Sequence, residues 1–402
     1  MSTHYNMGTQ DFHPSFLDYT PLLVCDFTTL APGLASTLFG LSHTRASAAT
    51  VQTGTSTIFS SLLVDQAGIG RALDADPAAL VIDEARTNLF PYSRDMVTIK
   101  SNSTVTPNVG SPDGTGLGDR TQTAAGVVGA YYPIGAGANV NVCSSMWVAA
   151  PAGVTTQAWQ VEWNDAGGTG GVSAGEVIVI GAAWQRRVLK AFSSTAGTMY
   201  LVCQEGRNAY AIPSANTCDA IIDFVQGEVG KFATEAIVTS GAAAATRAGA
   251  RLWHPSLNQI MTGGRLSMRA ILQAKGATTD YATSPYLWFA NASNYATISN
   301  STGAVTLVIN GASYTTAGGV TWAQGDVLDI RIMAGGGVSN SVVKIGKNGG
   351  ALTTLGTSPA PQAAIPAGLA LDLLQDSTAA NVLSSRLRTL SFYRPGALEV
   401  LP

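Results

Sequence analysis

The sequence Asp83-Glu84-Ala85-Arg86-Thr87-Asn88-Leu89-Phe90 is among the most charged runs of a chain that is otherwise poor in charge. An irregular segment precedes it, and a long series of short apolar runs follows it. We therefore interpret this run as the hinge between an N-terminal attachment segment and folded domains. Alternate residues of an extended strand share a face, so Glu84, Arg86 and Asn88 are expected to pair locally, in a structural role.

The composition excludes several classes of protein. Only 12% of the residues are charged and the formal net charge is −3, so no polybasic face is evident and nucleic acid is not an expected partner. Sparse Lys and Glu argue against a mainly helical fold, whereas plentiful Ser, Thr, Val and Gly suit strands joined by tight turns. No apolar run approaches the ~20 residues of a membrane span. The polar start, Met1–Gln10, lacks the apolar core of a signal peptide, so we expect synthesis in soluble form in a cytoplasm, without membrane insertion.

Two series of strands are predicted downstream of the hinge, with Gly-, Pro- and Asn-rich turns between them. In the second series, Asn310-Gly311 and Asn348-Gly349-Gly350 indicate hairpins, because Asn and Gly accept the positive φ of a type I′ turn. The first series comprises Val127–Ile134, Asn141–Ala149, Gln157–Trp163, Glu176–Ile180, Arg186–Phe192, Thr198–Glu205 and Ala220–Gln226. The second comprises Arg265–Leu272, Tyr286–Phe289, Tyr295–Ser299, Val305–Ile309, Val327–Met333, Val342–Gly346, Leu369–Leu374 and Leu387–Tyr393.

Strands this short and evenly spaced are typical of antiparallel sandwiches. We expect an all-β fold of two tandem antiparallel β-sandwich (jelly-roll) domains, preceded by an irregular N-terminal anchoring segment. The expected divisions are 1–82 for attachment and oligomerisation, 83–245 for the first sandwich and 246–402 for the second. Residues 1–40 lack clear periodicity and are either an arm that docks on a partner or a poorly ordered terminus. We favour the arm, because these residues are too apolar for a free tail.

The cysteines give no sign of a metal or other cofactor. Cys25, Cys143, Cys203 and Cys218 form no C-x-x-C motif, and no His lies close to them in sequence. Buried free thiols are expected, and a Cys143–Cys203 bridge would require those two strands to be neighbours.

Three groups of residues, within 44–89, 145–247 and 320–395, resemble parts of spike and fibre proteins on the virions of tailed phages and of the related gene transfer agents. The hinge and the residues before it match the order of motifs in that family, with Thr44-Arg45-Ala46-Ser47, Leu80-Val81-Ile82 and Glu84-Ala85-Arg86-Thr87-Asn88-Leu89. The resemblance implies a carbohydrate-binding-module-like jelly roll, whose strands match Ser145–Ala150, Ala183–Arg186 and Phe232–Thr234. The end of this domain in the family pattern matches Thr239, Gly241, Thr246 and Arg247. A concanavalin-type (laminin-G-like) domain is implied by Val320–Trp322, Ile345–Gly350 and Arg386–Pro395.

Catalysis is not expected from these residues. Cleavage of a polysaccharide needs two carboxylates on one cleft wall, about 5–10 Å apart, which on a strand appear at i and i+2 or i and i+4. Asp326 and Asp329 are three apart and fall on opposite faces of a regular strand. Asp219 and Asp223 share a face, but we interpret Asp219 as a strand-end residue. No G-x-S-x-G, H-E-x-x-H or P-loop motif is present.

Glycan binding is the chemistry that the aromatic residues favour, because a sugar presents an apolar C–H face to a ring and hydroxyl groups to polar side chains. In the first sandwich the candidates lie in and just after Trp159-Gln160-Val161-Glu162-Trp163. In the alternative interpretation both tryptophans fill the core, and Gln160 and Glu162 then lie on the outer face. The candidate contacts there are Gln160, Glu162, Trp163 and Asp165. In the second sandwich they are Trp288, Asn294, Tyr295, Tyr314 and Trp322.

The sequence therefore predicts a non-enzymatic virion surface spike or fibre that attaches a particle to host-cell surface polysaccharide. Its partners would be that polysaccharide, other virion proteins through the N-terminal segment, and further copies of itself in a trimer or pentamer, since repeated weak sites give avidity. A structural head or tail component without ligand binding is the alternative, and a polysaccharide depolymerase is third.

Overall fold

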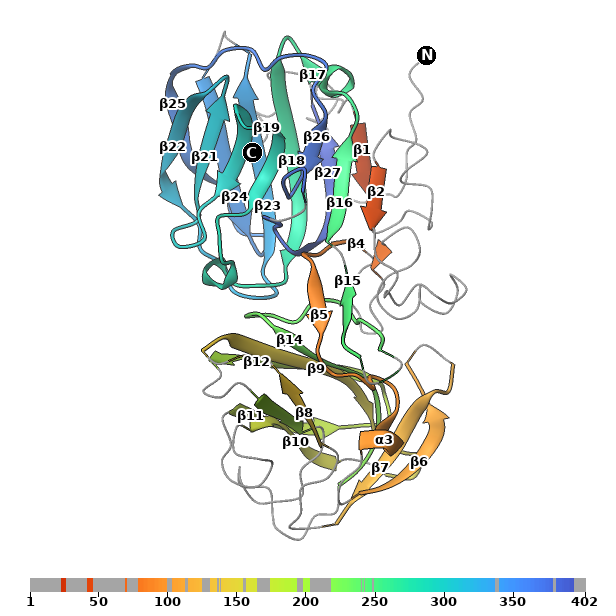
Figure 1. The fold of residues 1–402 in the computed structure, drawn as a ribbon. Coiled ribbons are helices and arrows are strands. Elements are labelled where there is room, and N and C mark those ends of the chain that lie inside the picture. The colour runs from red at the N-terminus through yellow and green to blue at the C-terminus, as the bar shows by residue number, and fades with distance from the viewer. Residues whose placement is uncertain are drawn as a thin grey trace.

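Two antiparallel β-sandwiches lie one above the other, joined by a narrow connection (Figure 1). The computed structural model describes residues 23–26, 42–45, 69–70, 79–99, 103–112, 115–124, 131–135, 137, 139–154, 157–164, 174–193, 198–202, 218–239, 241, 243–247, 249–336, 340–378 and 381–393. Within them the expected all-β architecture with two antiparallel β-sandwiches is confirmed. No helix of these residues is long and apolar enough to cross a membrane.

The first sandwich packs a five-stranded sheet against a four-stranded one around a small apolar core that includes Phe90, Val142 and Ile222. The five-stranded sheet has the order β12 (Gln185–Ser193), β9 (Asn141–Ala149), β14 (Cys218–Val229), β7 (Gly118–Thr123) and β6 (Ser103–Gly110). The four-stranded sheet has the order β11 (Ala174–Ile180), β10 (Gln157–Asn164), β13 (Thr198–Val202) and β8 (Tyr131–Gly135), and the short helix α3 (Met96–Ile99) precedes β6.

The second sandwich has the larger core, in which Trp288 is the largest fully buried side chain. One sheet follows β25 (Thr353–Pro361), β24 (Asn340–Lys347), β23 (Val327–Gly335), β18 (Arg265–Ala274), β27 (Ser385–Phe392), β4 (Ala79–Ile82) and β3 (Ile69–Gly70), with β1 (Leu23–Asp26) on β27 and β17 (Met261–Thr262) on β18. The other follows β2 (Ser42–Arg45), β16 (Ala250–His254), β26 (Leu371–Leu373), β19 (Tyr286–Asn291), β20 (Asn294–Ile298), β21 (Ala304–Ile309) and β22 (Ala312–Gly319). The 3₁₀ turns η3 (Leu257–Gln259) and η4 (Thr278–Asp280) lie between strands.

The strands β1 to β4 come from the range that the sequence assigned to a separate attachment segment, yet they are hydrogen-bonded into the second sandwich. Leu23 of β1 pairs with Phe392 of β27, and Ser42 of β2 pairs with Trp253 of β16. The first sandwich is therefore an insertion between β4 and β16. The short sheet of β5 (Arg86–Asn88) and β15 (Ala245–Arg247) carries the chain out to it and back.

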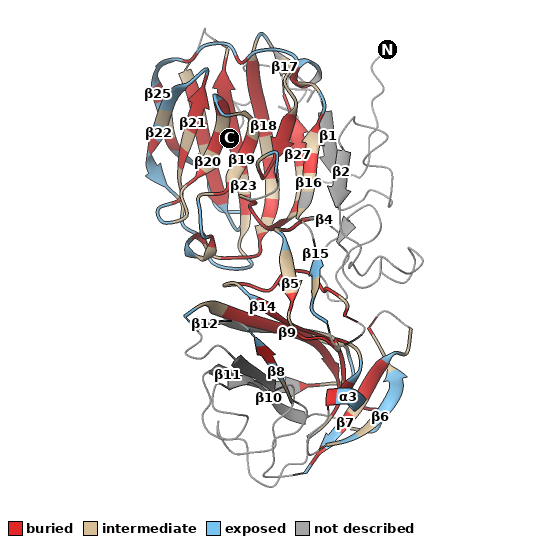
Figure 2. Cartoon of the chain, viewed as in Figure 1, coloured by how far each residue is buried: buried red, intermediate tan, exposed pale blue. Residues whose placement is uncertain are grey.

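Both hairpins expected from Asn-Gly sequences are confirmed. Asn310 and Gly311 have φ of 48° and 81° between β21 and β22, and Asn348 and Gly349 have φ of 53° and 72° between β24 and β25. The sequence missed several strands, among them β6, β22 and β25. These lie at sheet edges and carry mainly exposed residues (Figure 2), so their apolar alternation is too weak to recognise.

Candidate functional site

The hinge motif is built into a buried cluster of charges between the two sandwiches, which we call the seam. The seam centres on Asp83 and Glu235, both almost fully buried. Lys275 Nζ lies 2.7 Å from Asp83 Oδ1 and 2.8 Å from Glu235 Oε1, so one ammonium from the second sandwich bridges two carboxylates. Arg247 Nη2 donates to Asp83 Oδ2 at 2.8 Å. Two further guanidinium groups, of Arg186 and Arg386, approach Glu235 at 3.3 Å.

The electrostatics of the seam keep both carboxylates ionised. Burial alone would raise the pKa of Asp83, but Lys275 and Arg247 reverse this and hold that pKa below its usual value. Burial likewise opposes ionisation of Glu235, yet Lys275 and the nearby guanidinium groups hold its pKa well below the ordinary value. An unpartnered charge at either position would be costly in so dry a place, so the seam is a structural clasp.

Arg86 and Asn88 extend the clasp along β5. Arg86 Nε donates to Glu84 Oε1 at 2.8 Å, its guanidinium also bonds the Val229 carbonyl, and it lies 5.2 Å from the centre of the Phe232 ring. The buried Asn88 amide donates to the carbonyls of Val225 and Ile237, at 3.1 and 2.8 Å, and its oxygen accepts from the main-chain N–H groups of Phe90 and Gly227, each at 3.0 Å. Every hydrogen-bonding position of Asn88 is thus used for structure.

An apolar contact, which we call the plug, also joins the two sandwiches and is formed by Phe232, Tyr281 and Trp322. Phe232, which follows β14 of the first sandwich, belongs to the core of the second, and its ring centre lies 5.5 Å from that of Tyr281. Gly276 permits this approach, because a Cβ there would stand 2.5 Å from the Phe232 ring. Trp322, a predicted glycan contact, lies in this plug, with its Nε1 donating to the Gly276 carbonyl at 2.9 Å.

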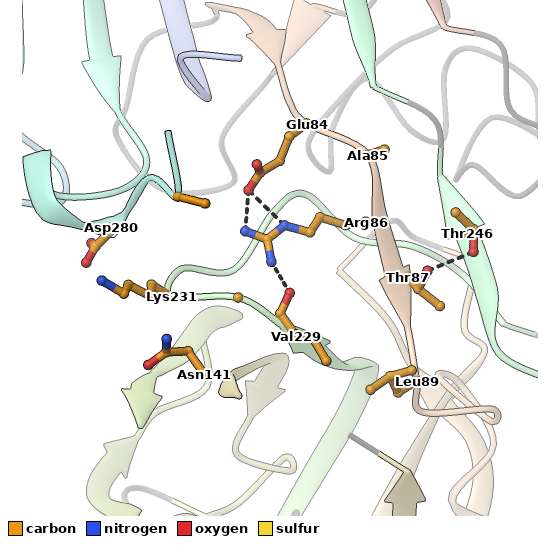
Figure 3. Close-up of a pocket in the computed structure, with 12 residues that line it drawn as sticks. Glu84, Ala85, Arg86, Thr87, Leu89, Asn141, Val229, Lys231, Thr246 and Asp280 are labelled. Carbon is orange, nitrogen blue, oxygen red and sulfur yellow. Dashed lines mark hydrogen bonds and ion pairs between the residues drawn. The ribbon is translucent and has the colours of Figure 1, made fainter. Parts of the chain in front are cut away.

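A pocket of about 770 Å³ opens beside the clasp, between the two sandwiches. Figure 3 shows Asn141, Lys231 and Asp280 gathered on one side of it, with Glu84 and Arg86 facing them. Burial raises the pKa of Glu84 above its usual value even though Arg86 acts against that shift. Thr87, Thr246, Leu89 and Val229 lie on the other walls.

The outer face of the seven-stranded sheet carries a cluster of aromatic rings, which we call the platform: Trp253, Tyr286, Phe289 and Tyr295. All four side chains are half-buried and none belongs to the core. The ring centres of Tyr286 lie 5.2 Å from Phe289 and 5.4 Å from Tyr295 in edge-to-face contact, while Phe289 and Tyr295 stack with centres 6.5 Å apart.

Strand register aligns three of these rings in one row. Trp253 is paired with Asp372, Asp372 with Phe289, and Phe289 with Tyr295, across the adjacent strands β16, β26, β19 and β20. Asp372 is buried between them and receives Arg251 Nε at 2.5 Å and Nη2 at 3.1 Å. The Arg251 guanidinium also lies 5.2 Å from the centre of the Trp253 ring.

A polar loop lies beside the platform, after the unusual turn at Leu374. Leu374 has φ of 59°, which is a genuine outlier for a bulky residue. Its turn is held by hydrogen bonds from its N–H to the Leu287 carbonyl at 3.0 Å and from the Leu383 N–H to its own carbonyl at 2.7 Å. Burial raises the pKa of Tyr286, assisted by the charge of Asp376 in this loop. Backbone strain of the kind seen at Leu374, when the surrounding structure holds it in place, is typical of ligand sites.

Most of the other predicted glycan contacts of the second sandwich lie in or against the core, or hold turns. Trp288 is fully buried in the core, and Tyr314 packs against that same core. Asn294 is 2% exposed and holds the hairpin turns, because its Oδ1 accepts from the Asn310 N–H at 3.1 Å and its Nδ2 donates to Asn291 at 3.1 Å. Tyr295 alone of the second group lies on the platform. In the first sandwich, Asp165 and the side chains of Gln160, Glu162 and Trp163 lie outside the described part of the structure.

The candidate catalytic carboxylates are all engaged in ion pairs. Asp219 pairs with Arg120 at 2.6 Å, and Asp223 with Arg94 at 2.8 Å. Asp329 pairs with Arg269 at 2.9 Å and with Arg331 at 3.1 Å. Cys143 is buried and free, and among the described residues no three His, Cys, Asp or Glu side chains gather as metal ligands would.

Comparison with known proteins gives little beyond this geometry. No protein-family model and no curated protein matches the sequence. Among solved structures, the N-terminal CBM22-1–CBM22-2 tandem domain of Xyn10C from Paenibacillus barcinonensis is similar over 78% of this chain and 99% of that one, with 11% identity and a TM-score of 0.28.

Proposed function

We propose that this chain is a non-enzymatic virion surface spike or fibre that attaches its particle to host-cell surface polysaccharide through the platform. The observation that carries the binding part of the proposal is a set of four partly exposed aromatic side chains on one sheet face, three of them in one row. Sugar rings stack their C–H faces on such side chains, and the polar loop that contains Asp376 supplies hydrogen-bonding groups beside them.

The placement on a virion rests on the resemblance of the hinge motif to spike and fibre proteins. Copies of the chain assemble as a homo-oligomer, trimeric in a tail fibre or pentameric at a capsid vertex, and attach to other virion proteins through the N-terminal segment. Multiple platforms on one particle then convert weak single-site binding into firm attachment.

A structural head or tail component without a ligand is the second candidate. The seam favours it, because buried ion pairs and the inserted Phe232 ring join the two sandwiches without any ligand. A depolymerase is less well supported, since Asp219, Asp223 and Asp329 are all ion-paired.

The test compares binding of purified host surface polysaccharide to the full chain and to the double variant Phe289→Ser/Tyr295→Ser. Loss of two stacking rings at about 1–1.5 kcal/mol each predicts a fall in affinity of roughly 100-fold. The matched control is Val109→Ser/Leu117→Ser, which removes exposed apolar side chains of the first sandwich and leaves affinity unchanged.

Equal affinity of the platform variant and the unmodified chain would refute the platform as the attachment site. Appearance of shortened polysaccharide chains during the incubation would instead establish a depolymerase. Imaging of particles with a labelled chain decides the virion placement separately, as well as the choice between head and tail.

A further inference from the structure

The pocket between the sandwiches is distinct from the platform, and the proposed function leaves it unused. Its walls come from the hinge and β15, from the start of β9 and the end of β14 in the first sandwich, and from η4 in the second (Figure 3). At about 770 Å³ it falls within the ~300–1,000 Å³ range of small-molecule sites. Any molecule that fills it touches both sandwiches at once.

Several polar groups that line the pocket retain hydrogen-bonding capacity. No hydrogen bond joins the Asn141 side-chain amide to another described residue, although its main-chain carbonyl accepts from Gly230 at 2.7 Å. Lys231 Nζ donates to the Thr279 carbonyl at 2.6 Å, which uses one of its three protons. Asp280 accepts the Ala277 N–H at 2.6 Å through Oδ2. Donors and acceptors therefore stand together on the side that faces Arg86.

The charges of the lining select against a charged ligand. Lys231 and Arg86 are cationic, and Glu84 and Asp280 are acidic, so the lining is balanced. Arg86 is already engaged with Glu84 and with the Val229 carbonyl. An anion would meet the two carboxylates and an amine would meet the ammonium group. A hydroxyl group, in contrast, both donates and accepts, and satisfies either kind of neighbour.

The apolar part of the lining suits the same kind of molecule. Leu89 and Val229 lie on the walls, and Val229 is 40% exposed, which is high for a large apolar side chain. Such surfaces accommodate the C–H face of a sugar ring, while hydroxyl groups reach Asn141, Lys231 and Asp280. We propose that this pocket is a second binding site, for a neutral polyhydroxylated ligand of one or two sugar units.

The test uses the full chain and neutral sugars (methyl β-glucoside, methyl β-galactoside, cellobiose and lactose), with binding measured by saturation-transfer NMR and titration calorimetry. Ala282→Trp places a large ring in the pocket and should abolish binding, whereas Ala317→Trp, on the exposed edge strand β22, should leave it intact. Asn141→Ala removes one side chain's hydrogen bonds and should weaken binding about tenfold. Glucuronate and glucosamine should bind several-fold more weakly than the neutral sugars.

The platform variant Phe289→Ser/Tyr295→Ser separates this site from the proposed attachment function. Neutral sugars should bind it as they bind the unmodified chain. The proposal is overturned if no neutral sugar binds, if Ala282→Trp binds like the unmodified chain, if the platform variant abolishes binding, or if a charged analogue binds more tightly. None of these outcomes depends on whether the platform recognises host polysaccharide.

Discussion

The seam and the platform depart from the usual distribution of side chains in opposite ways. In the seam, charged groups are buried, whereas on the platform large aromatic groups reach solvent. The buried carboxylates of Asp83 and Glu235 are each paired with cations at or below 3.3 Å, so the fold itself accounts for them. The platform rings are only partly exposed and belong to no core among the described residues, so the fold gives no reason for them. These partly exposed rings are therefore the better guide to function.

The largest expected effect tests whether the seam is a clasp. Asp83→Ala leaves Arg247 and Lys275 buried beside an empty position, which should destabilise the chain by about 3–5 kcal/mol. Denaturant unfolding, followed by tryptophan fluorescence, measures the change. The matched control is Asp219→Ala, which removes a partly exposed pair with Arg120 and should cost less than about 1 kcal/mol. Similar costs for the two variants would contradict the clasp.

Acid should weaken the seam without mutation, though less than the Asp83→Ala change. The pKa values of Asp83 and Glu235 are lowered in the folded chain, so the unfolded chain binds their protons more tightly. Their stabilisation is complete above the unfolded carboxyl values of about 4, and is lost as the pH falls through the lower folded values. Thermal midpoints measured from neutral pH down to about pH 3 should therefore fall steeply at the acid end.

The pKa of Glu84 is shifted upward, opposite to the shifts of Asp83 and Glu235, and this difference gives a second pH test. Its raised pKa means that the folded chain binds its proton more tightly than the unfolded chain does, so its protonation favours folding and partly offsets the loss at the seam. The variant Glu84→Gln should lose stability with falling pH more steeply than the unmodified chain. A shallower acid profile in this variant would contradict the assigned direction.

The smallest effect on stability should come from a platform residue. The comparison uses two neighbours on β19, the platform residue Phe289 and the core residue Trp288. Phe289→Ser removes a half-buried ring and should cost about 1 kcal/mol, whereas Trp288→Ala empties a fully buried position and should cost about 3–5 kcal/mol. Denaturant midpoints of the two variants give the comparison. Comparable costs would show that Phe289 is part of the core, and would weaken its assignment to a ligand site.

The neighbours Trp288 and Phe289 also show why the binding face could not be predicted from sequence. Regular alternation from the outward Tyr286 would place Trp288 outside and Phe289 inside. The structure has an irregular register between Tyr286 and Trp288, which exchanges the two faces. Sequence reasoning named Trp288, which is buried, and did not name Phe289, whereas Tyr295, on the regular strand β20, lies on the outer face.

Local signals, in contrast, gave most of the fold. The strand β9 has the predicted bounds, and the Asn-Gly turns have the predicted backbone, because both depend on neighbouring residues alone. The seam joins Asp83 to Lys275 across 192 positions and Arg247 across 164, and no local pattern encodes such a contact. The alternation of Glu84, Arg86 and Asn88 did indicate a structural role, although most of their partners lie far along the chain.

The pairing of β1 with β27 has a consequence for biosynthesis. Leu23 leaves the ribosome long before its partner Phe392 has been translated, and at roughly 5–20 residues per second the delay is on the order of tens of seconds. During that time the inserted first sandwich is complete and free to fold, while β1 and β4 expose unpaired strand edges. The nascent chain thus passes through a stage in which these strand edges are unpaired, and that stage ends only after β27 has been translated.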